Sequence, residues 1–409
     1  MKSLRHLFRV GRGPSSSHTI APYNAALSYR KLLSGMKFDR IQCILYGSFA
    51  LTGVGHGTDS VIREALEPYK VDFLFDTKTK ARHPNEMTLI AYYEDKAVLK
   101  RTYDSLGGGE IYSPDDESVN EYDIYPFRSF EEVKNYMKEH HLRTIKDFCL
   151  LFENKGIDEY LMECLDVMFL SVENGLRSQG KIPSNQNPRL QLTRVAGQIH
   201  DKALSISDRE EKDKLLITSY AYSVSEGNAC HDRLVTAPTC GASGILPAVL
   251  YYQYKEKGIG KEKLRDSLYV AGLFGNIVKQ NASIAGAIGG CQAEVGTATS
   301  MASSALCYLD SLSLYQMEYA AELAMEHFLG LSCDPVDGYV IIPCIERNGV
   351  GALRAYDSYL YSKYIAPIKK NQVSFDNVVS AMKLTGDALL DAYKETALGG
   401  LASILKDSK

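Results

Sequence analysis

The chain has 409 residues, of which 45% are hydrophobic and 23% are charged, and its formal net charge is −4. This composition is that of a globular protein with room for two or three domains, and it excludes a fibrous or disordered chain. The negative charge and the absence of a basic cluster argue against a nucleic-acid partner, and no apolar run is long enough to predict a transmembrane helix.

The nine cysteines are an odd number without paired spacings. This usage is typical of a reducing compartment, where thiols bind metal or pack in the core. The N-terminal segment MKSLRHLFRVGRG lacks the apolar core of a signal peptide. The sequence therefore predicts a cytoplasmic protein.

The first 110 residues or so predict an α+β domain with a mainly antiparallel sheet. Periodicity and turn formers favour helices at Leu4–Val10, Ala21–Leu33 and up to about Leu66, and strands at 39–46, 71–75, 87–93 and 98–105. The glycines at 107–109 favour a turn over a phosphate cradle of a pyridoxal-phosphate enzyme, because no nearby lysine has a Schiff-base context.

Two histidines of this domain lie in loops that are unusual for a core residue. His18 belongs to the run Ser15, Ser16, Ser17, His18 and Thr19, whose hydroxyls can cap the helix that follows and whose backbone N–H groups can bind a carboxylate. Plain capping explains the hydroxyls but not the imidazole. His56 lies in LTGVGHGTD, where three glycines indicate a tight loop close to a large group, although an exposed turn is the alternative.

An acidic stretch at 110–126 predicts a surface loop, and helices are expected at 129–140 and 144–154. We place a domain boundary near Lys155-Gly156, which gives an α+β domain at 1–154 and an all-α domain at 155–409. Helices of the second domain are expected at 157–178, 189–206, 211–225, from 245, 261–281, 293–311, 314–331, 349–365 and 374–396.

Three cysteines of the second half lie among turn formers. Cys333 and Cys344 belong to LSCDPVDGYVIIPCIERN, in which 339–342 reads as a short extended run, and Cys291 lies in GAIGGCQAEVG. A [4Fe-4S] cluster held by three thiolates leaves one iron open to act on a substrate as a Lewis acid. The alternative is that each cysteine is an apolar core residue.

These segments resemble the iron-sulfur L-serine dehydratases (L-serine ammonia-lyases). The resemblance extends to GPSSSHT, YGS, LTGVGHGTD, HPN, SLGGG, VTAPTCGASGILPAVL and ETALGGLA, in the same order along nearly the whole chain. It implies a single-chain enzyme with a β-type and an α-type domain, a [4Fe-4S] cluster on Cys291, Cys333 and Cys344, and dehydration and deamination of L-serine to pyruvate and ammonia. A small amino-acid substrate and a homodimer are expected.

The resemblance also implies that the loops of both domains close over one site. The candidate catalytic residues are His18, His56, Ser16 and Ser17, with proton abstraction assigned to one histidine or to a serine of the run. The candidate substrate-binding residues are Ser15, Thr19, Asn228, Thr239 and Arg347. Arg347 is a natural clamp for a carboxylate, although a helix-start ion pair with its neighbour Glu346 is the alternative.

Several positions depart from the family pattern. Cys240 stands where relatives commonly have Asn, and Ala285 and Ile288 replace Ser and Glu. These changes leave two alternatives open. One is the same cluster chemistry on threonine or cysteine, and the other is a closed cluster with Cys240 as fourth ligand in a redox sensor.

Overall fold

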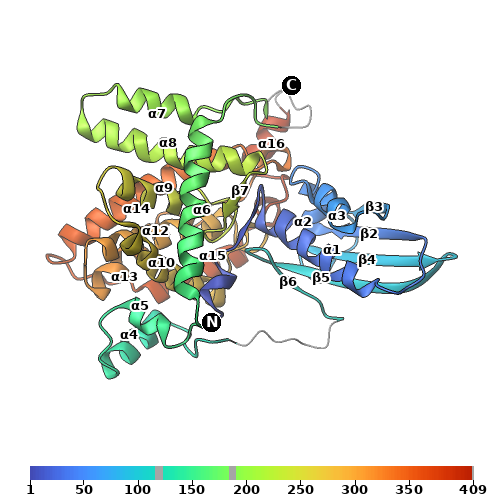
Figure 1. Cartoon of the computed structure of the whole chain (residues 1–409), viewed down its shortest axis with the longest axis horizontal. Coiled ribbons are helices and arrows are strands. Elements are labelled where there is room, and N and C mark those ends of the chain that lie inside the picture. The colour runs from blue at the N-terminus through green and yellow to red at the C-terminus, as the bar shows by residue number, and fades with distance from the viewer. Residues whose placement is uncertain (116–122, 184–189, 408–409) are drawn as a thin grey trace.

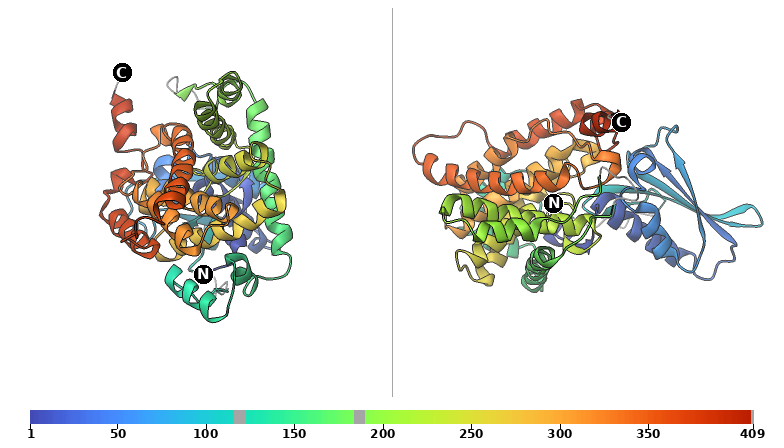
Figure 2. Two further views of the ribbon diagram at one scale, coloured as in Figure 1. Left: turned by 90° about the vertical axis from the view of Figure 1, so that its left-hand side faces the viewer. Right: turned by 90° about the horizontal axis from the view of Figure 1, so that it is seen from above.

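The computed structural model describes residues 1–115, 123–183 and 190–407. It has a sheet-containing part that projects from a larger helical body (Figures 1 and 2). The expected α+β architecture, with a sheet in the N-terminal part and helices after it, is confirmed. Within the described ranges, the helices include none that combine the length and the apolar character needed to cross a bilayer.

The sheet has five strands in the order β3-β2-β4-β5-β6. Its strands are β2 (Arg40–Tyr46), β3 (Val71–Asp76), β4 (Glu86–Tyr93), β5 (Lys96–Gly107) and β6 (Glu110–Tyr112). Only β2 and β3 run parallel, and the other neighbours pair antiparallel, as predicted. The glycines at 107–109 form the β5–β6 turn with positive φ angles, so the turn reading is confirmed.

Helices α1 (Ala21–Leu32), α2 (Gly47–Thr52) and α3 (Thr58–Leu66) accompany this sheet. Alternating side chains of β2, such as Ile41, Cys43 and Leu45, are fully buried and share a core with Tyr29 of α1 and Ile62 of α3. Because α2 ends at Thr52 and α3 begins at Thr58, and both helices contribute to this core, the core fixes both ends of the loop that carries His56.

The helical body is built around α12 (Thr297–Leu309), which contacts α10 (Lys261–Asn281), α13 (Leu314–Glu326) and α14 (Cys344–Ile365). The remaining helices are α6 (Ile157–Arg177), α7 (Ala196–Leu204), α8 (Arg209–Ala229), α9 (Ile245–Lys255), α11 (Gly286–Gly289), α15 (Phe375–Ala388) and α16 (Gly400–Asp407). The small residues 302–305 of α12 are all buried, which permits the close helix packing that the sequence predicts.

The predicted helix at Leu4–Val10 is wrong. Only Leu4–His6 form a 3-10 turn, and Val10–Arg12 form strand β1, which pairs antiparallel with β7 (Arg233–Val235) of the helical body. Leu4, Leu7 and Phe8 are fully buried in the large helical core. Tertiary pairing has overridden the local helical pattern, and it ties the start of the chain to the second half.

The helices α4 (Phe130–Glu139) and α5 (Ile145–Leu150) lie before the expected boundary at 154/155. Their apolar side chains, such as Val133 and Phe148, belong to the large helical core. The packing therefore joins 130–150 to the helical body, while the boundary between domains 1–154 and 155–409 stays a prediction. Part of the expected surface loop, 116–122, lies outside the described residues.

Other element limits differ from the prediction. Helix α14 begins at Cys344 and not at Gly349, and its glycines permit close packing within the helix: a Cβ on Gly349 would lie 2.9 Å from the Tyr222 ring. The run at 339–342 forms no strand. Helix α15 ends at Ala388, because the next residue, Leu389, has an extended backbone conformation. Helix α7 begins only at Ala196, and part of its predicted N-terminal turn lies outside the described residues.

Candidate active site

One cavity between the helical body and the N-terminal part is lined by all three predicted cysteine ligands, Cys291, Cys333 and Cys344. Its wall also includes Ser15, His56, Glu294, Arg347 and Glu395. Residues nearly 400 positions apart in the sequence thus meet at one site. The structure brings together the two groups of loops that the resemblance implies.

Each cysteine is placed by a different local structure. Cys291 immediately precedes the π-helical turn Gln292–Gly296, which continues into α12. Cys333 lies in an extended segment whose backbone N–H donates to the Tyr393 carbonyl at 2.8 Å. Cys344 is the first residue of α14. The thiols of Cys291 and Cys333 and a carboxylate oxygen of Glu294 lie within 4.8 Å of one another.

Two glycines beside the cysteines are required by space. A Cβ on Gly286 would lie 3.0 Å from the Cys333 sulfur and 3.2 Å from a Glu294 oxygen, so a side chain there would press on both groups. Gly290 has a φ of +74°, and a Cβ on it would lie 2.7 Å from the Leu331 carbonyl oxygen. Gly286 therefore lets the backbone lie against the Cys333 thiol, and Gly290 allows the left-handed turn before Cys291.

Arg347 is held by the cysteine loop itself. Its guanidinium donates to the Ser332 carbonyl at 2.8 Å and to the Asp334 carboxylate at 2.9 Å. A hydrogen bond from Cys333 and the charge of Arg347 lower the pKa of Cys291, which favours the thiolate that binds metal. Contact between Arg347 and a substrate stays a prediction, and the alternative pairing with Glu346 is not what this side chain makes.

The opposite wall carries a stacked histidine pair. The rings of His18 and His56 have centroids 4.5 Å apart, and both are fully buried. The Ser48 hydroxyl donates to the Glu395 carbonyl and the Thr52 hydroxyl to the Ser48 carbonyl, so both hydroxyl oxygens are left to accept from His18 Nε2, at 3.0 and 3.2 Å.

That arrangement decides the tautomers of both rings. His18 carries its proton on Nε2, and its Nδ1 accepts from the Ser17 hydroxyl at 2.9 Å. His56 Nδ1 lies 2.9 Å from the Thr52 carbonyl and therefore donates to it. His56 Nε2 is left with a buried lone pair and no hydrogen-bond partner among the described residues. Burial lowers the pKa of His56 to about 4, so the ring is neutral near pH 7.

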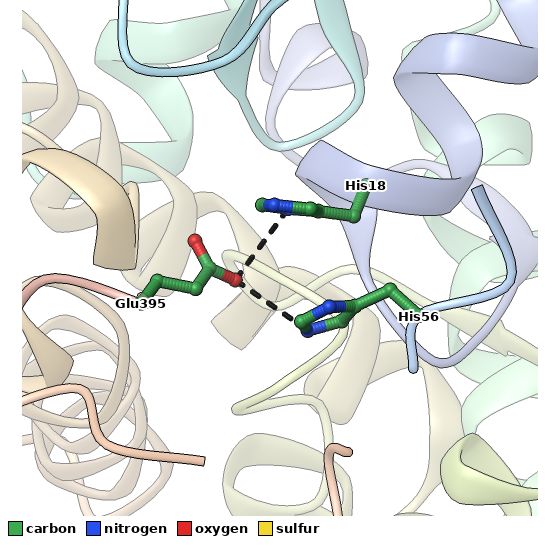
Figure 3. A group of neighbouring side chains, drawn as sticks. All are labelled: His18, His56 and Glu395. Carbon is green, nitrogen blue, oxygen red and sulfur yellow. Dashed lines mark ion pairs between the residues drawn. The ribbon is translucent and has the colours of Figure 1, made fainter. Parts of the chain in front are cut away.

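Glu395 also belongs to this wall, although its sequence pattern does not single it out. Its Oε1 lies 3.6 Å from His18 Nδ1 and 3.7 Å from His56 Nε2. Figure 3 marks both pairs with dashed lines. Its backbone N–H donates to the Cys333 carbonyl at 2.9 Å, so the same residue also contacts the cysteine loop. Burial and the nearby Glu294 and Cys291 raise the pKa of Glu395 well above its ordinary value.

Comparison with known proteins shows the family of the chain. The family model described as serine dehydratase alpha chain matches residues 82–402, and the one described as serine dehydratase beta chain matches 3–74. The chain belongs to the serine dehydratase family. It is 36% identical to an L-serine dehydratase of Helicobacter pylori strain J99 over 99% of both chains. It is 38% identical to an L-serine dehydratase of Streptomyces coelicolor over 98% of both chains. L-serine dehydratase 1 of Escherichia coli K12 is 35% identical over 98% of this chain and 99% of its own.

The other predicted site residues differ in how close they lie to the cavity. Ser15 lines it, and its hydroxyl accepts from the His18 backbone N–H at 3.1 Å. Ser16 is buried in the turn that follows. The Thr19 hydroxyl donates to the His56 carbonyl at 2.9 Å, so it holds the second histidine loop in place. The hydroxyl groups of the 15–19 run therefore hold the histidine segments in place in addition to capping the helix.

Asn228 and Thr239 lie behind the wall. The Asn228 amide donates to the Pro14 carbonyl at 2.8 Å, next to Ser15, but Asn228 does not line the cavity. Thr239 is buried close to Gly241, which does line it. Cys240 lies between Thr239 and Gly241 in the sequence, and its thiol is fully buried and does not line the cavity. Substrate binding by Asn228 or by Thr239 stays a prediction.

Two acidic residues were thus missed by sequence reasoning. Glu294 lies in GCQAEVG and Glu395 opens ETALGGLA, both of which carry the family resemblance. Burial raises the pKa of Glu294 to about 6. The available signal was the carboxylate inside each motif. A cysteine or a pair of glycines is the more conspicuous feature of these motifs, so the acidic residue is easily overlooked.

Proposed function

We propose that this member of the serine dehydratase family dehydrates and deaminates L-serine to pyruvate and ammonia, with a [4Fe-4S] cluster held by Cys291, Cys333 and Cys344. The observation that carries the proposal is the single cavity that three cysteines share with His56 and Glu395. The names of the full-length relatives, L-serine dehydratase, support the same reaction.

The residues present fit such a cluster. Thiolates are the usual ligands of iron-sulfur clusters, and the three cysteines line the same cavity. When bound by three thiolates, the cluster supplies a Lewis-acidic iron that stabilises the departing hydroxide of serine. Glu294 lies near Cys291, so the possible metal ligands at this place include a carboxylate as well as thiols.

The chain supplies the proton-transfer groups. His56 Nε2 has a free lone pair at the cavity, and its Nδ1–H is fixed on the Thr52 carbonyl, so it is the group that can remove the α-proton. Both nitrogens of His18 are already engaged, and His18 therefore positions His56 and Glu395. Since His56 is neutral near pH 7, no prior deprotonation is needed.

The substrate carboxylate binds best at the Ser15 end of the cavity. Ser15 begins the helical turn that leads into α1, where backbone N–H groups attract an anion, and Arg347 adds a positive charge on the other side. Elimination gives aminoacrylate, which hydrolyses without catalysis to pyruvate and ammonia. The buried walls exclude water during the reaction.

The position of Cys240 gives no support to a closed cluster in a redox sensor, because its thiol is not part of the cavity wall. Threonine and cysteine stay as alternative substrates. The test is anaerobic reconstitution with iron and sulfide, followed by measurement of keto acid from L-serine, L-threonine and L-cysteine. We expect pyruvate from L-serine at the highest rate. Full activity in an iron-free preparation, or a bound pyridoxal-phosphate absorption band, would overturn the cluster chemistry.

The homodimer, the cytoplasmic location and the absence of a nucleic-acid partner stay predictions from the sequence. Sedimentation of the reconstituted protein measures the first of them directly. A single species with twice the chain mass of 45.4 kDa is the expected result.

A further inference from the structure

Two buried acceptors face each other across the histidine wall. His56 Nε2 bears a lone pair, and Glu395 Oε1 lies 3.7 Å away, too far for a direct hydrogen bond. Neither His56 Nε2 nor Glu395 Oε2 has a hydrogen-bond partner among the described residues, and both residues line the cavity. Figure 3 shows the carboxylate directed at the two rings. A ligand that donates hydrogen bonds would satisfy both acceptors.

Among the described residues, Glu395 forms no ion pair with a lysine or an arginine. Its ion-pair contacts are to His18 and His56, and burial lowers the pKa of both rings, so both are neutral near pH 7. Glu294 differs, because burial raises its pKa to about 6 while the nearby charge of Arg347 opposes that rise. A buried carboxylate without a cation is costly. Glu395 is therefore the acidic group of the cavity that most needs a positive partner.

We infer that Glu395 binds the α-ammonium group of the substrate and so selects amino acids over 2-hydroxy acids. The inference rests on the proposed function and deepens it, because it assigns the third functional group of serine. An ammonium donates three hydrogen bonds and carries the missing charge. Its nitrogen is bonded to the α-carbon, so binding at Glu395 brings the α-proton next to His56 Nε2, 3.7 Å from the same carboxylate.

The selectivity follows from the loss of that charge. A 2-hydroxy acid presents one hydroxyl in place of the ammonium, and it leaves the carboxylate of Glu395 without a cation. A site built around a buried charged group discriminates strongly against a ligand that lacks the partner. We expect at least about a tenfold preference for the amino acid.

The test compares L-alanine with L-lactate, because neither has a β-leaving group and neither reacts. Binding to the reconstituted holoenzyme is measured anaerobically by calorimetry. The wild type should bind L-alanine at least tenfold more tightly than L-lactate. Glu395→Gln should lose at least tenfold in L-alanine affinity and less than threefold in L-lactate affinity, and Glu395→Asp, which keeps the charge, should retain part of the preference.

Glu322→Gln is the matched control, since Glu322 is a buried carboxylate of α13 that accepts from Asn371 and does not line the cavity. It should leave both affinities unchanged. Equal weakening of both ligands by Glu395→Gln, or no change in either, would overturn the inference; so would a divalent metal ion bound stoichiometrically at the histidines of the wild type and lost in Glu395→Gln.

The two proposals fail separately. A wild type that releases no pyruvate from L-serine refutes the proposed reaction, whereas the binding preference is measured with ligands that do not react. If pyruvate forms and the preference does not depend on Glu395, only the ammonium assignment fails. Should Glu395→Gln not fold, the Glu395→Asp variant decides the outcome by its intermediate preference for L-alanine.

Discussion

The two walls of the cavity are built in different ways. The thiol wall comes from the helical body, where Cys333 and Cys344 are eleven residues apart and Gly286 lets the backbone lie against the Cys333 sulfur. The histidine wall is assembled from three distant segments, around His18, His56 and Glu395, joined by hydrogen bonds through Ser48 and Thr52. The difference teaches that the three cysteines are brought together within the helical body, whereas the histidines and Glu395 come together only where the two parts of the chain meet.

The largest effect should come from the thiol wall. Replacing Cys291, Cys333 or Cys344 by Ser removes one of three thiolates, and we expect loss of the cluster and of all serine turnover, measured as bound iron and as pyruvate. Cys307→Ser is the control, because Cys307 is buried in α12 away from the cavity. It should retain iron and lose only about 1 to 3 kcal/mol of stability. A full cluster in any of the three ligand variants would show that the assignment is wrong.

Separating the walls tests whether one of them suffices. A fragment from Ile157 to Lys409 lacks both histidines, and it also lacks Leu4, Leu7 and Phe8, which are part of the helical core. We expect no serine turnover and a loss of cooperative unfolding, followed by circular dichroism. Turnover by the fragment near the full-length rate would refute a site shared between the two parts.

Within the histidine wall, His56→Ala should lower turnover by about 10²-fold or more, because a general base contributes at least that much. The cluster absorption should be unchanged, which separates this variant from the cysteine variants. His327→Ala is the control, because that side chain is 41% exposed at the end of α13. A His56→Ala variant with near-normal turnover would return the role of base to His18 or to a serine of the 15–17 run.

The smallest effect concerns pH and stability. Burial lowers the pKa of His56 to about 4, from an ordinary value of 6.5. Between these values the unfolded chain binds a proton that the folded chain does not, so the free energy of unfolding falls as the pH falls. For one group the slope is at most about 1.4 kcal/mol per pH unit.

The measurement is urea unfolding of the cluster-free protein at pH 7 and pH 5. His56→Gln should lose about 1 to 2 kcal/mol less stability than the wild type between these two values, because the titrating group is gone. His18, whose pKa burial also lowers, still titrates in the variant. An equal loss in both proteins would show that His56 does not titrate as its burial requires.

The sequence by itself determined the fold class, most helices and strands, and the residues of the thiol wall. Periodicity places α10 at Lys261–Asn281 without error, because its apolar stripe and its ends are local features. Cys291, Cys333 and Cys344 stand out for the same reason, since turn formers and glycines surround each of them. His18 and His56 stand out because neither a cap nor a turn needs an imidazole.

Only the tertiary structure decided the limits and the contacts that depend on distant partners. Strand β1 forms because β7, more than 200 residues away, pairs with it. The helix that begins at Cys344 contains Gly349 and Gly351, which local propensity disfavours but against which Tyr222 and Ile245 pack closely. The role of Glu395 can be inferred only from its position beside two buried imidazoles and a cysteine loop. A carboxylate becomes a binding group through the burial and charge around it, and those are properties of the folded chain.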